Sequence, residues 1–232
     1  MIADARDPWL LLDSGAGDCA LNMALDEALL EFAPETRQPV LRFYGWTQPA
    51  ASFGYFQHIA EIERATSLRP LVRRPTGGGL VPHDADWTYS VAIPPAHPWY
   101  ELRAAESYER MHVWIQSAFR LLGIATELAP CCRTDIPGQC FAGYEKSDVL
   151  RLGKKMAGAA QRRTRTGLLI QGSIQPPPMG VSRQEWQDAM IQSGATAWNF
   201  DFDPLALPAA LRERVEFLAS AKFSRDEHNR RR

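Results

Sequence analysis

The sequence predicts an α/β (α+β) fold in which mixed β-sheets are flanked by helices. Short runs rich in β-branched and aromatic residues, such as residues 87–93, recur along the chain and favour strands. Between them lie stretches with apolar residues at helical spacing, of which residues 104–122 form the clearest example. The 232 residues are 45% hydrophobic and 23% charged, a balance that allows a sizeable core.

The first half of the chain alternates between strands and helices. A first strand is expected at residues 9–12, and Asp18 is a good N-cap for the helix that follows. We expect Asp26 and Glu27 on the solvated side of this helix, where most helical carboxylates lie. The further elements expected are strands at 40–44 and 50–55, a helix at 59–66, and strands at 71–74 and 87–93.

The second half begins after residues 94–98, where three prolines exclude both helix and central strand. The elements expected next are the helix at 104–122, a hairpin of residues 148–152 and 155–162, and a strand at 167–174 ended by prolines at 176–178. Ser182 and Glu185 have capping-box spacing, which predicts a helix through about residue 191. A last helix at 205–221 is expected to be followed by a flexible charged tail at 224–232.

Charge and apolar runs restrict the possible partners. The formal net charge of −1 gives no overall attraction to nucleic acid or to an anionic membrane. No apolar run reaches the length of a membrane span, and residues 9–12 are too short for a signal-peptide core. We therefore expect a cytoplasmic protein with no nucleic-acid and no membrane partner.

Four cysteines in a chain of this size do not indicate a disulfide framework. Cys131, Cys132 and Cys140 lie near one another in sequence, but their spacing matches none of the usual zinc patterns and no histidine is close. The sequence therefore predicts no metal site.

Three consecutive glycines at residues 77–79 carry the first chemical signal. Such a run costs backbone entropy, and it is tolerated where the main chain adopts unusual conformations or where a ligand touches the backbone. Arg73 and Arg74 precede it and His83 follows it, so N–H groups and guanidinium groups together suit an anionic or strongly polar ligand. His83 could act as a general base or position the loop, and we favour positioning. On these residues alone, a glycine-rich hairpin explains the pattern equally well.

Four blocks of sequence, in the same order, resemble the biotin/lipoate A/B protein ligase family. They are N-M-A-L-D-E-A at 22–28, R-F-Y-G-W at 42–46 with S-F-G-Y-F-Q at 52–57, R-R-P-T-G-G-G-L-V-P-H-D at 73–84, and G-K-K-M-A-G-A-A-Q-R-R at 153–163 followed by G-L-L-I-Q-G-S-I at 167–174. The resemblance implies the mixed-sheet architecture that biotin ligases share with class II aminoacyl-tRNA synthetases. We expect one catalytic domain over residues 1–232, because a chain of this length has no room for the C-terminal accessory domain that many lipoate ligases carry.

The resemblance also implies site residues. Lys155 stands at the place of the family's essential lysine, next to a solvated Lys154, although a slip of one residue stays open. Cys140, before Phe141, resembles the nucleophile of the octanoyltransferase branch; a thiolate can accept an acyl group from a thioester without ATP. Taken without the family, Lys155 would be a surface lysine and Cys140 an inert thiol. The expected substrate-binding residues are Arg73, Gly77, Gly78, Gly79, His83, Ala157, Gly158, Ala159 and Gln161.

Three functions follow as hypotheses. In the first, an octanoyl or lipoyl group passes from acyl carrier protein to Cys140 and then to a lysine of a lipoyl domain, with no cofactor; the acceptors would be the glycine cleavage H protein or the E2 subunit of a 2-oxoacid dehydrogenase. A variant moves the group between two lipoyl-domain proteins. The second is an ATP- and Mg-dependent lipoate ligase, which takes free lipoate as donor and binds lipoyl-adenylate at residues 77–79 and Lys155.

The third hypothesis is a non-catalytic protein that binds lipoyl domains or acyl carriers, and the presence of both Lys155 and Cys140 argues against it. A biotin ligase is disfavoured because the Cys140 loop would have no role there. Either enzymatic hypothesis needs an apolar slot for the acyl chain, between the glycine loop and the strand at 157–160.

Overall fold

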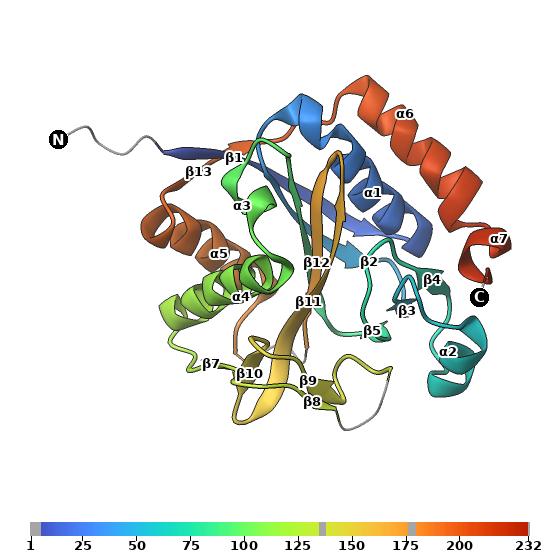
Figure 1. Cartoon of the computed structure of the whole chain (residues 1–232), viewed down its shortest axis with the longest axis horizontal. Coiled ribbons are helices and arrows are strands. Elements are labelled where there is room, and N and C mark those ends of the chain that lie inside the picture. Colours follow the sequence, from blue (N-terminus) through green and yellow to red (C-terminus); the bar gives the residue numbers. More distant parts are fainter. Residues whose placement is uncertain (1–5, 135–137, 176–179, 232) are drawn as a thin grey trace.

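The computed structural model describes residues 6–134, 138–175 and 180–231. Within these residues the central sheet has eight strands in the order β13-β1-β2-β6-β12-β11-β10-β7 (Figure 1). Strand β1 runs parallel to both its neighbours, and the other neighbours in this sheet pair antiparallel. In chain order these strands are β1 (Asp7–Gly17), β2 (Val40–Trp46), β6 (Trp87–Ile93), β7 (Glu127–Leu128), β10 (Val149–Arg151), β11 (Lys154–Thr164), β12 (Gly167–Ile174) and β13 (Phe200–Pro204).

Two small sheets lie beside the central one. The first has the order β4-β3-β5, and the second pairs β8 with β9. Their strands are β3 (Ala50–Phe53), β4 (Leu71–Arg73), β5 (Val81–His83), β8 (Arg133–Thr134) and β9 (Gly143–Tyr144).

Helices cover both faces of the central sheet, as strand alternation requires. Val40 packs in the cluster formed with α1 and α6, whereas its neighbour Leu41 packs in the cluster formed with α4 and α5. The helices are α1 (Cys19–Thr36), α2 (Ile59–Ala65), α3 (Pro98–Glu101), α4 (Ala104–Leu121), α5 (Arg183–Ala197), α6 (Ala209–Leu218), the π-helix η1 (Ala219–Phe223) and α7 (Asp226–Asn229).

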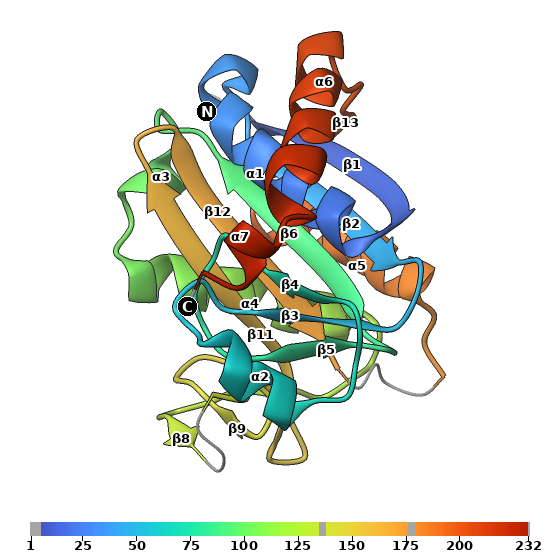
Figure 2. The ribbon, with the colours of Figure 1, turned by 90° about the vertical axis from the view of Figure 1, so that its right-hand side faces the viewer.

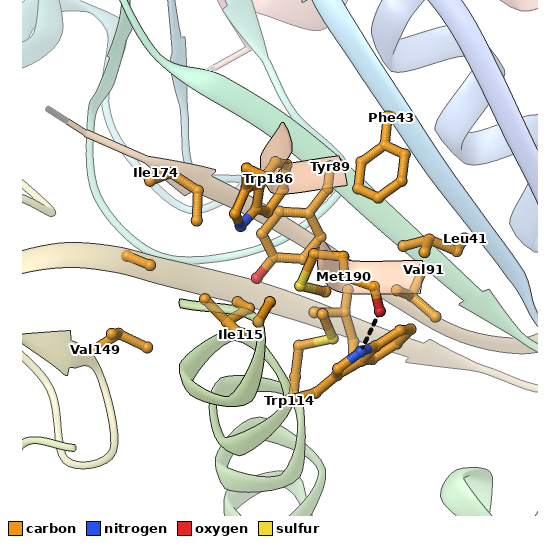
Figure 3. Close-up of a cluster of buried hydrophobic side chains, with 14 of the residues drawn as sticks. Leu41, Phe43, Tyr89, Val91, Trp114, Ile115, Val149, Ile174, Trp186 and Met190 are labelled. Carbon is orange, nitrogen blue, oxygen red and sulfur yellow. Dashed lines mark hydrogen bonds between the residues drawn. The ribbon is translucent and has the colours of Figure 1, made fainter. Parts of the chain in front are cut away.

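Aromatic side chains fill the core between the sheet and the α4–α5 pair. Figure 3 shows Trp186 and Met190 packed near Tyr89 of the central sheet, with Trp114 of α4 on the other side of Met190. Trp114 Nε1 donates a hydrogen bond to the Met190 carbonyl at 2.9 Å, so even the indole polar group is paired. This core gives β11 and β12, which carry part of the candidate site, a rigid support.

The predicted fold class is confirmed, and so are the strands at 87–93 and 167–174. Asp18 caps α1 by accepting from the Leu21 amide at 2.7 Å. The prediction missed β5 and β13 because Val81–His83 and Phe200–Pro204 contain proline and aspartate, which have low strand propensity. They become strands by pairing with β3 and β1.

Two C-terminal predictions need correction. The expected helix at 205–221 begins later, at Ala209, because Pro208 occupies its N-cap, and it continues as η1. The expected flexible tail at 224–232 is contradicted in its described part: α7 packs beside β4 (Figure 2), where Arg73 N donates to Asn229 Oδ1 at 2.9 Å. This contact joins segments far apart in sequence, so composition alone could not indicate it.

The prolines at 176–178, expected to end β12, lie outside the described residues. In the part of the chain that the structure describes, no helix combines the length and the apolar character needed to cross a membrane.

Candidate active site

A cavity lies between the glycine loop, the Cys140 loop and β11. One part of its wall is apolar and another carries cationic and thiol groups, as an activated acyl group requires at its two ends. The lining residues are Met23, Tyr44, Trp46, Ser52, Arg74, Val81, His83, Thr88, Cys140, Phe141, Lys155, Gly158, Ala159, Ala160, Gln171, Gly172 and Ser173.

Gly78 brings the glycine loop into contact with the opposite wall. Its φ of +81° is a left-handed conformation, and a Cβ built on it would lie 3.6 Å from both Cys140 Sγ and the Ala160 Cβ. From the other side, a Cβ on Gly54 would lie 1.9 Å from the Gly78 carbonyl oxygen. The loop and β11 therefore face each other, as expected, and the block at 52–57 contains a glycine because the loop backbone passes over it.

Arg74 holds the glycine loop from inside. Its Nη2 donates to the Gly77 carbonyl at 2.6 Å and to the Gly79 carbonyl at 2.7 Å. Burial lowers the pKa of Arg74 from its usual value. The sequence predicted that Arg73 binds substrate, and the structure does not support that, because Arg73 donates to the Tyr55 and Gln57 carbonyls at 2.8 and 2.7 Å, away from the cavity. In extended chain, neighbouring side chains point to opposite faces. Arg73 and Arg74 are adjacent in sequence, and they therefore have different partners.

Cys140 presents its thiol to the glycine loop. The Gly79 amide donates to Cys140 Sγ at 3.0 Å, and the Cys140 amide donates to the Leu80 carbonyl at 3.2 Å. The side chain is partly exposed, and it lines both the cavity and an adjoining recess that contains Gly78 and Gly79. The thiol is therefore both oriented by backbone and reachable.

Lys155 forms a buried ion pair with Asp148. Its Nζ lies 2.7 Å from Asp148 Oδ2, and the two side chains are 5% and 0% exposed. Asp148 also accepts from the Tyr108 hydroxyl, and from the Glu145 amide at 2.6 Å. Burial and the neighbouring Asp148 raise the pKa of Tyr108 well above its usual value, so the phenol keeps its proton and donates. The carboxylate is thus fully satisfied and holds the lysine in one place.

The spacing of lysine and glycine in β11 has a steric cause. A Cβ on Gly158 would lie 2.3 Å from Lys155 Cε and 2.5 Å from Lys155 Nζ. The lysine side chain therefore lies across the strand over Gly158, in space that any other residue would fill. Lys154 is exposed, so Lys155 is the lysine whose ammonium reaches the cavity.

His83 has both ring nitrogens engaged. Nδ1 lies 2.8 Å from Asp86 Oδ2, Nε2 lies 2.8 Å from Ser52 Oγ, and the ring stacks on Trp46 at a centroid distance of 3.9 Å. Ser52 Oγ also accepts from Arg74 Nη1 at 3.4 Å. A histidine held in this way supports the cavity wall and the loop arginine.

Asp26 was expected in solvent, and the structure shows this to be wrong. Its side chain is fully buried and accepts from Arg42 Nη1 and Ser90 Oγ, both at 2.6 Å. Its second oxygen accepts from Gln171 Nε2 at 2.7 Å and from the Tyr44 hydroxyl at 3.1 Å. Tyr44 and Gln171 line the cavity, so this buried cluster forms the support beneath it.

The same cluster joins residues from the four separate sequence blocks through hydrogen bonds. Thr76 Oγ1 donates to Gln171 Oε1 at 2.7 Å, which links the glycine-loop block to the block at 167–174. Asn22 Oδ1 accepts from Arg42 Nη2 at 2.8 Å. The spacing of Asn22 and Asp26, four residues apart on one helix face, was the available signal for this site. Glu27, also expected in solvent, is mostly buried and lies 2.6 Å from Lys222 Nζ.

The structure brings several predicted residues together and excludes others. Cys140, Lys155, His83, Gly158 and Ala159 line the cavity, and Gly78 and Gly79 line the adjoining recess. The remaining ones serve the scaffold: the Gly77 carbonyl accepts from Arg74, Ala157 packs in the core, and Gln161 Nε2 donates to the Ala104 carbonyl of α4 at 2.6 Å.

Sequence reasoning missed Asp148 and Tyr108, because each acts through a neighbour that is distant in sequence. It assigned substrate binding to Arg73, whereas Arg74 lines the cavity. Among the described residues, no three His, Cys, Asp or Glu side chains gather closely enough to hold a metal ion.

Known proteins are similar to this chain in sequence and in fold. Octanoyltransferase LipM of Geobacillus kaustophilus is 31% identical, covering 97% of this chain and 99% of that enzyme. LipM of Bacillus subtilis is 36% identical, covering 73% of this chain and 66% of that enzyme. Solved structures of lipoate-protein ligases share the fold. One bound with ATP has TM-score 0.80 at 22% identity, covering 97% of this chain and 99% of that one. One from Thermoplasma acidophilum with bound lipoic acid has TM-score 0.78 at 22% identity, covering 97% and 100%.

The family model described as the lipoyl protein ligase A/B catalytic domain matches residues 18–175, and these residues contain Cys140, Lys155 and the buried Asp26 cluster. The chain belongs to the lipoyl protein ligase A/B catalytic domain family.

Proposed function

We propose that this protein is a cysteine-dependent octanoyltransferase of lipoate metabolism. It moves an octanoyl or lipoyl group from acyl carrier protein to a lysine of a lipoyl domain, through a thioester on Cys140. The observation that carries the proposal is the position of Cys140 Sγ in the same cavity as Lys155, 3.0 Å from the Gly79 amide. The relatives named octanoyltransferase LipM support it.

The first step exchanges one thioester for another. The Cys140 sulfur attacks the carbonyl carbon, a new C–S bond forms, and the C–S bond to the carrier breaks. The carrier thiolate takes up the proton that Cys140 has lost. Because one thioester replaces another, the step is nearly balanced in free energy and needs no ATP.

In the second step the amine of the acceptor lysine attacks the Cys140 thioester. A C–N bond forms, the C–S bond breaks, and a proton passes from the amine to the leaving sulfur. In both steps negative charge develops on the carbonyl oxygen, where Lys155, oriented by Asp148, supplies a cation.

The acyl chain occupies the apolar part of the cavity. Met23, Trp46 and Val81 line this part, and the buried Asp26 cluster lies behind it. Apolar contacts thus hold the acyl chain, while its carbonyl end is placed at Cys140.

Intact-mass measurement tests the proposal. Incubation with octanoyl-acyl carrier protein without ATP should add one octanoyl group to the protein, and an apo lipoyl domain (H protein or E2) should then remove it. Cys140→Ala should lose both the adduct and the transfer, while Cys131→Ala and Cys132→Ala stay near wild type because both side chains are exposed outside the cavity. A reaction that needs ATP and Mg and survives Cys140→Ala would establish the ligase hypothesis instead.

A further inference from the structure

The tip of the β10–β11 hairpin carries an unexpected residue. Leu152 is 92% exposed and has a φ of +51°, and Gly153 after it has a φ of +70°. A two-residue turn with positive φ at both positions favours Asn or Asp before Gly, and a leucine there has both backbone strain and an exposed side chain. Such a departure from local preference, at a side chain this exposed, is typical of a binding surface.

A groove runs from this tip to the candidate active site. Its lining includes Leu152, Gly153 and Lys154 of the hairpin and residues 141–144. Phe141 and Lys155 line both the groove and the cavity that contains Cys140. A group on a long arm can therefore reach Cys140 through the groove while the body of its carrier rests on the hairpin.

The rim of this groove is mainly cationic. Arg151 and Lys154 flank the turn and are exposed, and Arg133 also lines the groove, while the Lys155 ammonium is paired with Asp148. Asp84 is the acidic residue among the described residues that line the groove, and Glu145 lines the adjoining recess. An apolar contact inside a positive rim is complementary to an acidic protein surface with a small apolar patch.

We propose that Leu152, Arg151 and Lys154 form the docking surface for the acyl donor, a small acidic carrier domain that bears its thioester on a long flexible arm. This rests on the proposed function above. The donor is favoured over the acceptor because the hairpin tip lines the groove but not the cavity that contains Cys140, and the donor's prosthetic arm is several times longer than a lysine side chain.

Separate measurement of the two half-reactions tests the docking surface. The rate constant for acylation of Cys140 is followed by intact mass, once with octanoyl-acyl carrier protein and once with the octanoyl thioester of N-acetylcysteamine, which has no protein body. The variants are Leu152→Asn, which suits the positive φ and keeps the turn, and Lys154→Glu. Phe217→Ser is the matched control, since Phe217 is a 56% exposed aromatic on α6.

Both variants should lower the rate constant with the carrier by about tenfold or more and leave the rate with the small thioester unchanged. The effect of Lys154→Glu should shrink as salt is raised, because rim charges act mainly on association. Phe217→Ser should match wild type with both donors.

Wild-type rates with the carrier in both variants would overturn the docking surface. So would an equal loss with the small thioester, which would place the effect in the chemistry, or a loss confined to transfer from the acylated enzyme to the lipoyl domain, which would assign the surface to the acceptor. If neither thioester acylates the wild-type protein, the proposed function itself fails, and that outcome differs from all the others.

Discussion

At the scale of single residues, the site depends on two glycines, because a side chain at either position would fill space that another residue occupies. Gly158 leaves the space in which the Lys155 side chain lies, and Gly78 leaves room for the Arg74 guanidinium, since a Cβ on Gly78 would lie 2.9 Å from Arg74 Nη2. These two glycines serve side chains of other residues. Their neighbour Gly77 does not: a Cβ there would meet no atom within 4 Å.

Gly158→Ala should therefore inactivate the enzyme without unfolding it. The added methyl group must displace Lys155 from its place beside Asp148, and we expect acyl transfer to fall about a hundredfold or more, as for loss of a charge-stabilising group. Transfer rates from octanoyl-acyl carrier protein and thermal melting check this. Gly77→Ala is the control and should keep near wild-type activity; equal rates in the two variants would contradict the steric explanation.

The Lys155–Asp148 pair permits a second test on stability. Asp148→Asn leaves a 5% exposed lysine without its counter-charge, which should cost about 3–5 kcal/mol of unfolding free energy. Combining it with Lys155→Met should recover much of that stability while activity stays lost. Urea unfolding of the single and double variants measures the coupling between them. Additive losses in the double variant would show that the two charges do not interact.

At the scale of elements, α7 stabilises the strand that leads into the glycine loop. The Arg73 amide in β4 donates to Asn229 Oδ1 at 2.9 Å, and the Arg73 carbonyl oxygen lies 3.1 Å from His228 Nε2. The next residue is Arg74, which holds the loop carbonyls. The C-terminal helix therefore acts on the site through Arg73, the last residue of β4, which directly precedes Arg74.

Asn229→Ala should lower the free energy of unfolding by about 1–2 kcal/mol, because a buried amide loses its acceptor. We also expect slower acylation of Cys140, with the same mass of adduct at completion. Asp226→Ala is the control on the same helix, since that side chain is 85% exposed and its ion pair contributes little. An Asn229→Ala variant with wild-type stability and rate would exclude a role for α7 in holding β4.

Elements also show what the sequence could and could not predict. The strands at 87–93 and 167–174 and the long helix α4 have strong local patterns, and they were predicted within a residue. The burial of Asp26 could not be read from its own helix, because it depends on Arg42 from a neighbouring strand. Arg73 and Arg74 differ by one position in an extended segment, so the register of β4 decides which one faces the cavity.

At the scale of the whole molecule, buried histidines link stability to pH. Both ring nitrogens of His112 lack a hydrogen-bond partner among the described residues, and burial lowers its pKa to about 4. Unfolded histidine titrates near 6.5. Between these two values the unfolded chain binds a proton that the folded chain does not, so stability is full above about pH 6.5 and is lost as the pH falls toward 4. Burial also lowers the pKa of His228 to about 4, with the same direction.

His112→Phe should flatten this pH dependence. The phenyl ring has a similar size and no proton to bind, so the variant should lose up to about 3 kcal/mol less stability than wild type between pH 6.5 and 4. Urea unfolding at several pH values measures both slopes. The pH dependence due to His228 should remain in the variant. If the unfolding free energy of the variant and of wild type depended on pH in the same way, His112 would not stay neutral in the fold.

The parallel pairing of β1 with β13 affects how the chain can fold while it is being synthesised. Asp7 pairs with Phe200 and Leu11 with Pro204, whereas the other edge of β1 is closed early, by β2. Until residues 200–204 leave the ribosome, the outer edge of β1 therefore presents unpaired backbone groups to other nascent chains. Fragments that stop short of β13 should accordingly aggregate or recruit chaperones, even though they contain Cys140, Lys155 and the whole glycine loop.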